Sequence, residues 1–232
     1  LQLLWTALMT PFYRGRVEPY REWLHAQPLE DFHQSYEFYR LQLQILQRYV
    51  RRDHWILKSP AHLYSVDSLV HAFPDAIVIQ THRDPTAVIP SWCSMTATMD
   101  QIFYPQVDPQ EVGQRTMRIL KNTLDRMRRA RQTLPAGRII DVGYNELLAD
   151  PHGVVERIYH ASGTPFTDAV DQSVRDLIDR DQKSERLKHR YSPEDFGMTR
   201  AQIDHELSDY LHDFGHLCGR NAAAKVTATA NS

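Results

Sequence analysis

Residues 76–85 read Ala-Ile-Val-Ile-Gln-Thr-His-Arg-Asp-Pro, and this stretch decides the fold class. Its first part, Ala76–Gln80, is a continuous apolar and β-branched run, which is typical of a strand buried on both faces of a parallel sheet. Asp84 and Pro85 then combine an N-cap residue with a proline at the first helical position, so we expect a helix from there through Met95. The stretch therefore predicts a strand that leads directly into a helix.

The same arrangement is expected on either side of this stretch. Trp55–Lys58 is a short apolar run that predicts another strand, and the Ser59-Pro60 pair predicts the start of a helix that ends before Pro74. A third strand is expected at Arg138–Val142. Strands that alternate with helices in this way predict a right-handed βαβ crossover and a parallel sheet.

The rest of the chain is predicted to be mainly helical. We therefore expect a helix-rich α/β fold, with a parallel sheet flanked by helices, as one domain over residues 1–220, followed by a disordered tail at 221–232. The remaining helices are expected at residues 3–9, 36–49, 109–133, 145–162 with a break at 150–151, 168–180 and 199–217.

Composition narrows the class of protein. The 232 residues are 42% hydrophobic and 24% charged, with a net charge of −2, which argues against bulk electrostatic capture of nucleic acid or of a membrane surface. No apolar run approaches the roughly 20 residues that span a bilayer, so no membrane span is expected. Cys93 and Cys218 lie far apart, which fits a reducing compartment, and we expect a cytoplasmic protein.

Polar side chains follow each predicted strand, at the edge where open α/β sheets bind ligands. Arg83 stands just before a helix N-terminus and can grip phosphate oxygens bidentately, and Ser91 lies about two helical turns further on. Together they suit a phosphate monoester. The alternative is that Arg83 pairs with Asp84 or another carboxylate and that Ser91 only packs.

Several motifs together resemble the family of sulfotransferases that use 3'-phosphoadenosine-5'-phosphosulfate (PAPS), especially its bacterial branch. The matching segments occur in order along the chain: Trp55–His62, Phe73–Ala76, Thr81–Pro85 with Ser91, Tyr144–Leu147 with Asp150-Pro151, and His189–Gly197. The resemblance implies a P-loop-NTPase-like sulfotransferase fold. It also implies transfer of a sulfuryl group from PAPS to an acceptor hydroxyl or amine by in-line displacement, without a metal.

The resemblance also implies roles for individual residues. Arg83 and Ser91 would hold the 3'-phosphate of PAPS, and Tyr144 would lie near the adenine. A loop from Lys188 to Tyr191 would close over the nucleotide, with His189 or Arg190 contacting phosphate.

Two further residues are candidates for catalysis. The ammonium group of Lys58 would offset negative charge on the leaving nucleotide. His62 is the candidate general base because an imidazole titrates near neutral pH. In animal relatives the histidine comes two residues after the lysine, where this chain has Pro60, so a capping or packing role for His62 stays open.

One part of the family pattern is missing. No glycine- and threonine-bearing loop that would wrap the 5'-phosphosulfate can be identified among the residues of this chain. We expect that loop upstream of Leu1; otherwise the chain is not a competent sulfotransferase by itself. The alternatives are a non-catalytic nucleotide-binding module and a P-loop-related kinase, for which no Walker-type residues are found.

The acceptor cannot be read from the sequence: a small molecule, a lipid or a glycan all fit, and a homo-oligomer is compatible with it. Thr96–Tyr104, which carries one methionine and two aromatic residues, is the candidate acceptor segment. The spacing of His212 and His216 suits one helical face, but without a third ligand no metal site is expected. The basic residues of 109–133 are expected to form a solvated surface rather than a nucleic-acid patch.

Overall fold

The computed structural model describes residues 18–28, 32–49, 54–182 and 191–220. The chain forms two compact units. The first unit comprises residues 1–76, 91–135 and 196–198, and the second comprises residues 77–90, 136–195 and 199–232. The single domain over residues 1–220 stays a prediction. The expected helix at residues 3–9 and the tail at 221–232 lie outside the described residues.

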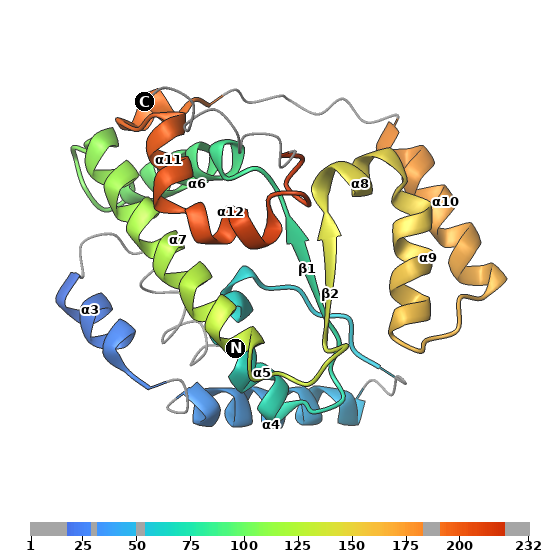
Figure 1. Ribbon diagram of the computed structural model, residues 1–232. Helices are drawn as coiled ribbons and strands as arrows, with labels where there is room; N and C mark the ends of the chain where they lie inside the picture. Colours follow the sequence, from blue (N-terminus) through green and yellow to red (C-terminus); the bar gives the residue numbers. More distant parts are fainter. Residues whose placement is uncertain (1–17, 29–31, 50–53, 183–190, 221–232) are drawn as a thin grey trace, which may run out of the picture. The chain divides into compact units, whose positions relative to one another are not determined.

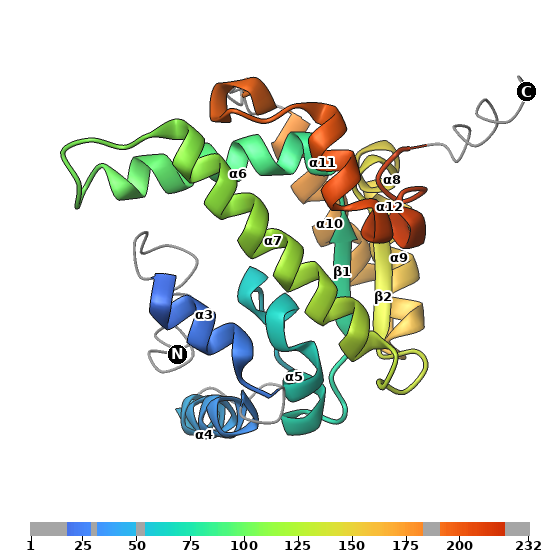
Figure 2. The ribbon, with the colours of Figure 1, turned by 60° about the vertical axis from the view of Figure 1, so that its left-hand side comes forward.

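The first unit is helical. Its described elements are α3 (Glu18–Ala26), α4 (His33–Tyr49), the 3₁₀ helix η3 (Pro60–Ser65), α5 (Val66–Ala72), the second part of α6 (Pro85–Asp100) and α7 (Pro109–Arg131). Helix α5 contacts both α4 and α7 (Figure 2). The core gathers aromatic and aliphatic side chains from these elements: Phe32, Tyr36, Tyr39, Leu43, Ala61, Tyr64, Ala72 and Ile119. Since the first four recur at helical spacing, one face of α4 is buried.

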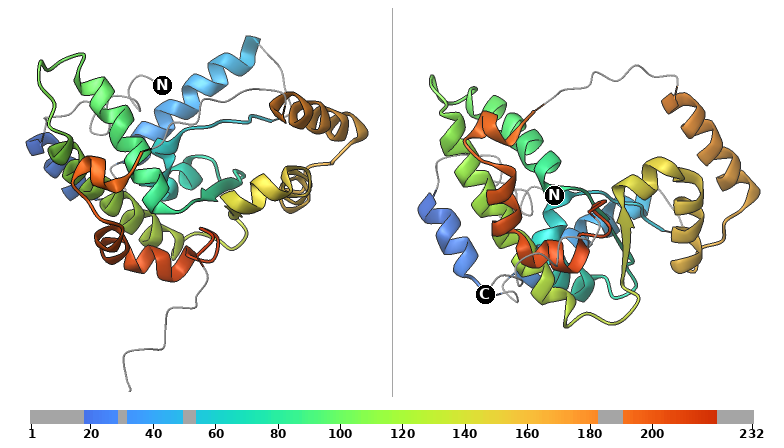
Figure 3. Two further views of the ribbon diagram at one scale, coloured as in Figure 1. Left: turned by 90° about the horizontal axis from the view of Figure 1, so that it is seen from above. Right: turned by 45° about the horizontal axis from the view of Figure 1, so that its top comes forward.

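The second unit contains the sheet. Strands β1 (Val78–His82) and β2 (Ile139–Gly143) pair in parallel, with Val78 opposite Ile139 and His82 opposite Gly143 (Figure 1). Helix α9 packs against both α8 and α10 (Figure 3). The helices of this unit are the first turns of α6, α8 (Tyr144–Ala149), α9 (Pro151–Ala161), α10 (Asp168–Gln182), α11 (Arg200–Glu206) and α12 (Ser208–Phe214), and the 3₁₀ helix η4 (Pro193–Phe196) ends at the boundary between the units.

Proline and an acidic cap start three helices, and the sequence predicts this start for the helix that follows Asp84-Pro85. The Asp108 carboxylate accepts a hydrogen bond from the Gln110 backbone N–H at 2.9 Å, and Asp150 accepts one from Gly153 N–H at 2.8 Å. At α6, Asp84 accepts from the backbone N–H of Thr86 at 2.9 Å. These carboxylates satisfy backbone donors that have no partner within the helix. The helix α6 continues through Pro90.

One predicted strand is wrong. Trp55–Lys58 is neither strand nor helix, and no strand among the described residues pairs with it. Trp55 and Leu57 are 42% and 44% exposed, and Ile56 is 80% exposed. An apolar run forms a strand only where a neighbouring backbone accepts its ladder hydrogen bonds, so composition alone misled the prediction. The helix expected after Ser59 begins there, but its first part is the 3₁₀ helix η3.

Two burial predictions also need correction. In β1, Gln80 and His82 are buried whereas Ile79 is 48% exposed, so the strand buries one face rather than two. This is the alternation of a half-buried strand. In α7, Arg115 and Arg126 are buried rather than solvated: Arg115 pairs with Asp100, and the Arg126 guanidinium lies over the rings of Phe32 and Tyr64.

No helix within the described ranges is long and apolar enough to cross a membrane.

Candidate functional site

The junction between β1 and α6 carries three consecutive polar residues with different environments. His82 ends β1 and is fully buried, Arg83 is exposed, and Asp84 caps α6. The burial of His82 follows from the alternation of β1, since Gln80 and His82 share a face. The junction therefore anchors the backbone on both sides of Arg83 and leaves its side chain accessible.

The Arg83 guanidinium lies over the ring of Tyr144, with its central carbon 4.4 Å from the ring centroid. Tyr144 is the first residue of α8, directly after β2, so the paired carboxyl ends of the two strands bring these side chains together. A cation over an aromatic face is attracted by the ring quadrupole, by about 0.5–1 kcal/mol at an exposed position. Across the described residues, no carboxylate pairs with Arg83. The alternative of an Arg83–Asp84 ion pair is therefore not what the structure shows.

The His82 side chain is held on three sides. Its Nε2 lies 2.8 Å from Asp141 Oδ1, and its Nδ1 lies 2.9 Å from the Tyr210 hydroxyl. The Phe214 ring stacks on the imidazole with centroids 4.5 Å apart. Since a carboxylate only accepts, Nε2–H donates to Asp141, and Tyr210 O–H can donate to Nδ1 of a neutral ring. These contacts fix the end of β1.

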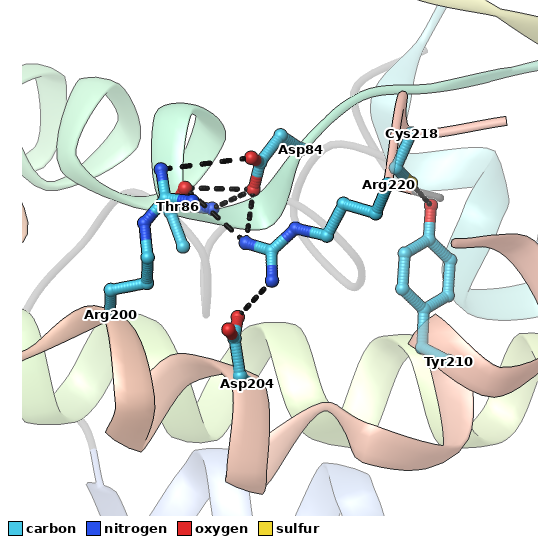
Figure 4. Close-up of polar contacts among 7 residues, drawn as sticks. All are labelled: Asp84, Thr86, Arg200, Asp204, Tyr210, Cys218 and Arg220. Atoms are coloured by element: carbon cyan, nitrogen blue, oxygen red, sulfur yellow. Dashed lines mark hydrogen bonds and ion pairs between the residues drawn. The ribbon is translucent and has the colours of Figure 1, made fainter. Parts of the chain in front are cut away.

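Asp84 lies in a cluster of charged residues, shown in Figure 4. Its Oδ1 accepts hydrogen bonds from the Thr86 hydroxyl at 2.8 Å and from Arg220 Nη2 at 2.6 Å, and Arg200 lies 3.9 Å from Oδ2. Arg220 also donates through Nη1 to Asp204 at 2.5 Å. Burial raises the pKa of Asp84, but the hydrogen bonds from Arg220 and Thr86 outweigh it and hold that pKa below its ordinary value. Asp84 is therefore ionised and neutralised by neighbouring arginines.

In the first unit, His62 packs among aromatic side chains. Its Nδ1 lies 3.0 Å from the Tyr36 hydroxyl, and its ring lies 5.7 Å and 5.9 Å from the Tyr36 and Tyr39 rings. Burial lowers the pKa of His62 to about 4. A base whose conjugate acid has so low a pKa accepts protons weakly near neutral pH. The geometry favours the packing role that the sequence left open.

The protonation of His62 also depends on Tyr36, whose pKa is raised by burial. If Tyr36 O–H donates to Nδ1, then Nε2 carries the ring proton and cannot accept another. Nε2 is free to act as a base only if Nδ1–H donates to Tyr36 instead. The role of His62 as a general base stays a prediction.

Among the described residues, the structure does not place the other predicted site residues next to Arg83. Lys58 is exposed and precedes Ser59, whose hydroxyl caps η3 by accepting from Ala61 N–H at 3.3 Å. Ser91 is exposed on α6. Both belong to the first unit and Arg83 to the second, so a site that they share stays a prediction. His189 and Arg190 lie outside the described residues.

Sequence reasoning missed the residues that surround Arg83. The sequence predicts Asp84 as a helix cap, but Arg220 is 136 positions away from Asp84, and Tyr210 is 128 positions from its partner His82. No local pattern signals such pairings. As for metals, no group of three or more His, Cys, Asp or Glu that could hold an ion occurs among the described side chains.

Comparison with known proteins gives a consistent result. Residues 6–168 match the model of the sulfotransferase family. Curated relatives include omega-hydroxy-beta-dihydromenaquinone-9 sulfotransferase Stf3 of Mycobacterium bovis and of Mycobacterium tuberculosis, each 26% identical over 114 residues, which are 49% of this chain and 29% of the relative.

Solved structures agree. Sulfotransferase STF1 from Mycobacterium tuberculosis H37Rv is 28% identical with a TM-score of 0.75, over 87% of this chain and 51% of that one. STF9 from Mycobacterium avium is 27% identical with a TM-score of 0.74, over 84% and 50%. The chain thus spans about half the length of these structures and less than a third of the curated relatives. The family match covers well over half of the chain, and the α/β sulfotransferase fold is confirmed. This chain belongs to the sulfotransferase family.

Proposed function

We propose that this chain serves PAPS-dependent transfer of a sulfuryl group to an acceptor hydroxyl or amine. PAPS is the usual donor of the family, and when bound it supplies the activated sulfuryl group. The proposal is supported by the family membership and by the arrangement at the carboxyl ends of β1 and β2.

One observation carries the donor assignment. The Arg83 guanidinium is exposed, lies 4.4 Å over the Tyr144 ring and has no carboxylate partner in the described ranges. A guanidinium with free donors suits the planar, bidentate recognition of phosphate. The Tyr144 ring adds an aromatic surface against which an adenine can pack. These residues fit the 3'-phosphate and base of the nucleotide.

The remaining site residues extend this proposal. Ser91 would add a hydroxyl donor to the 3'-phosphate, and His189 and Arg190 would add contacts to phosphate. Lys58 would place an ammonium near the leaving oxygen and stabilise charge that develops there. Its exposed position on an irregular segment leaves it accessible. His62 would take the proton of the acceptor through Nε2, in the tautomer whose Nδ1–H donates to Tyr36.

For the acceptor we propose a lipidic molecule with a hydroxyl group. The support is the name of the curated relative, which specifies an omega-hydroxy dihydromenaquinone. Met95, Met99, Ile102 and Phe103, at the end of α6 and just after it, are exposed apolar side chains on which such a molecule could pack. We also propose a cytoplasmic location, since Cys93 and Cys218 are both free thiols.

The test is thermal stabilisation of the protein by three nucleotides. A ligand that binds the folded state raises its stability in proportion to the logarithm of concentration over Kd. We expect 3',5'-diphosphoadenosine (PAP) to stabilise more than 5'-AMP or ATP at equal concentration. Equal stabilisation by PAP and 5'-AMP would refute a 3'-phosphate site, and a preference for ATP with Mg²⁺ would favour a kinase.

A further inference from the structure

Arg220 links two carboxylates in the second unit. Its guanidinium donates to Asp84 at 2.6 Å and to Asp204 at 2.5 Å, and only 21% of its side chain is exposed. Figure 4 shows it between the start of α6 and helix α11. A partly buried guanidinium that satisfies two carboxylates is more strongly held than an exposed surface pair.

The segment that carries Arg220 also borders Tyr144. A Cβ placed on Gly219 would lie 2.2 Å from Asn145 Nδ2, and one on Gly143 would lie 2.9 Å from the Leu217 carbonyl oxygen. Gly219 has a φ of +76°, a conformation that favours glycine. The residues on both sides of Tyr144 are therefore in close contact with the residues that precede Arg220.

Asp84 is adjacent in sequence to Arg83, which makes its charge important for any anion there. An unneutralised carboxylate would attract the long, exposed Arg83 side chain, and it would repel a phosphate dianion within a Debye length. In the structure, Arg220 and Arg200 neutralise Asp84, and the Arg83 guanidinium lies on Tyr144 instead.

We propose that Arg220 is a positioning residue for anion binding at Arg83: it neutralises Asp84 and so leaves the Arg83 guanidinium available to the 3'-phosphate. The inference rests on the proposed function. Arg220 acts without contacting the phosphate, and its effect passes through the negative charge of Asp84.

The test measures the Kd values of PAP and 5'-AMP for the intact protein by calorimetry and takes their ratio, since a general loosening of the fold weakens both nucleotides. Arg220→Gln should reduce the preference for PAP about fivefold, the factor that corresponds to an ion pair of about 1 kcal/mol. Arg220→Lys retains the charge and should restore most of the preference.

Charge removal at Asp84 provides the decisive comparison. Asp84→Asn keeps an N-cap acceptor for Thr86 but removes the negative charge, so the preference for PAP should be equal to or higher than that of the wild type. In the Asp84→Asn background, Arg220→Gln should have no further effect on the ratio. Arg175→Gln, which breaks the Arg175–Asp171 pair on α10, is the matched control and should leave the ratio unchanged.

The outcomes separate the two proposals. If the wild type prefers PAP and a folded Arg220→Gln variant keeps the full preference, the inference is wrong. The inference is also wrong if Arg220→Gln lowers the preference for PAP as much in the Asp84→Asn background as it does in the wild type. The role of Arg220 would then be structural. If Arg220→Gln does not fold, a lost preference in Asp84→Asn overturns the inference. A wild type with no preference for PAP refutes the proposed function and the inference with it.

Discussion

Replacement of Arg83 by alanine removes the residue on which the donor assignment depends. A hydrogen bond to a charged group contributes about 1.5–3 kcal/mol. Because Arg83 is exposed and solvent screens its charge, we take the lower part of that range, about 1.5–2 kcal/mol. The Kd for PAP should therefore rise about 10- to 30-fold.

The fold should tolerate this change. The main interaction that Arg83 loses is its contact with the Tyr144 ring, so the free energy of unfolding should fall by less than about 1 kcal/mol. Calorimetric titration with PAP and with 5'-AMP distinguishes the cause: only the affinity for PAP should fall. Arg175→Ala removes an exposed arginine of the same unit and serves as the control. Unchanged PAP affinity in a folded Arg83→Ala protein would refute the phosphate assignment.

Three further predictions concern other residues. Lys58→Ala should lower turnover about 10²- to 10³-fold, as loss of a transition-state donor does, with little change in the affinity for PAP. Steady-state kinetics measures the turnover and calorimetry the affinity. Unchanged turnover would refute the role of Lys58. Burial lowers the pKa of His62 to about 4, whereas an unfolded histidine titrates near 6.5. The neutral, buried His62 therefore contributes about 3 kcal/mol to stability above pH 6.5. This contribution is lost as the pH falls towards 4. Urea unfolding from pH 7 to pH 4 should show this loss, and His62→Gln should remove it; an unaltered pH dependence would contradict the assigned burial. Asp84→Ala should cost about 1–2 kcal/mol in urea unfolding through loss of the α6 cap and Asp84→Asn clearly less, so that equal costs would exclude a capping role.

The part of the fold that local sequence predicts is the part with local causes. The β-branched run before Arg83 and the cap-proline pair after it indicate β1 and α6, and both form within a few residues of the expected bounds. Strand β2 and the break between α8 and α9 at Asp150-Pro151 are predictable from the local sequence for the same reason. Such features depend on neighbours in the sequence, so no tertiary information is needed.

The errors have tertiary causes. Trp55–Lys58 has the composition of a strand, but a strand exists only with a hydrogen-bonded neighbour, which composition does not reveal. Arg115 and Arg126 look like surface charges of a basic helix, yet each finds a partner that removes it from water. The Ser59-Pro60 pair predicts where a helix starts, but it does not predict that the first part, η3, is a 3₁₀ helix.

The candidate site divides in the same way. Arg83 and Tyr144 are predictable because each follows a strand, and parallel strands bring their carboxyl ends to one edge. The partner of Asp84 is not predictable, since Arg220 reaches it across 136 residues through the placement of α11 and α12. In the inference above, the neutralisation of Asp84 leaves its neighbour Arg83 available to an anion. The residue that neutralises Asp84 is visible only in the folded structure.

The most direct test of the central claim is a crystal structure of the protein with PAP. We expect the 3'-phosphate within hydrogen-bonding distance of the Arg83 guanidinium, about 2.7–2.9 Å, with the adenine beside Tyr144. A complex in which the 3'-phosphate is bound elsewhere, while Arg83 stays on the Tyr144 ring without touching the nucleotide, would contradict it.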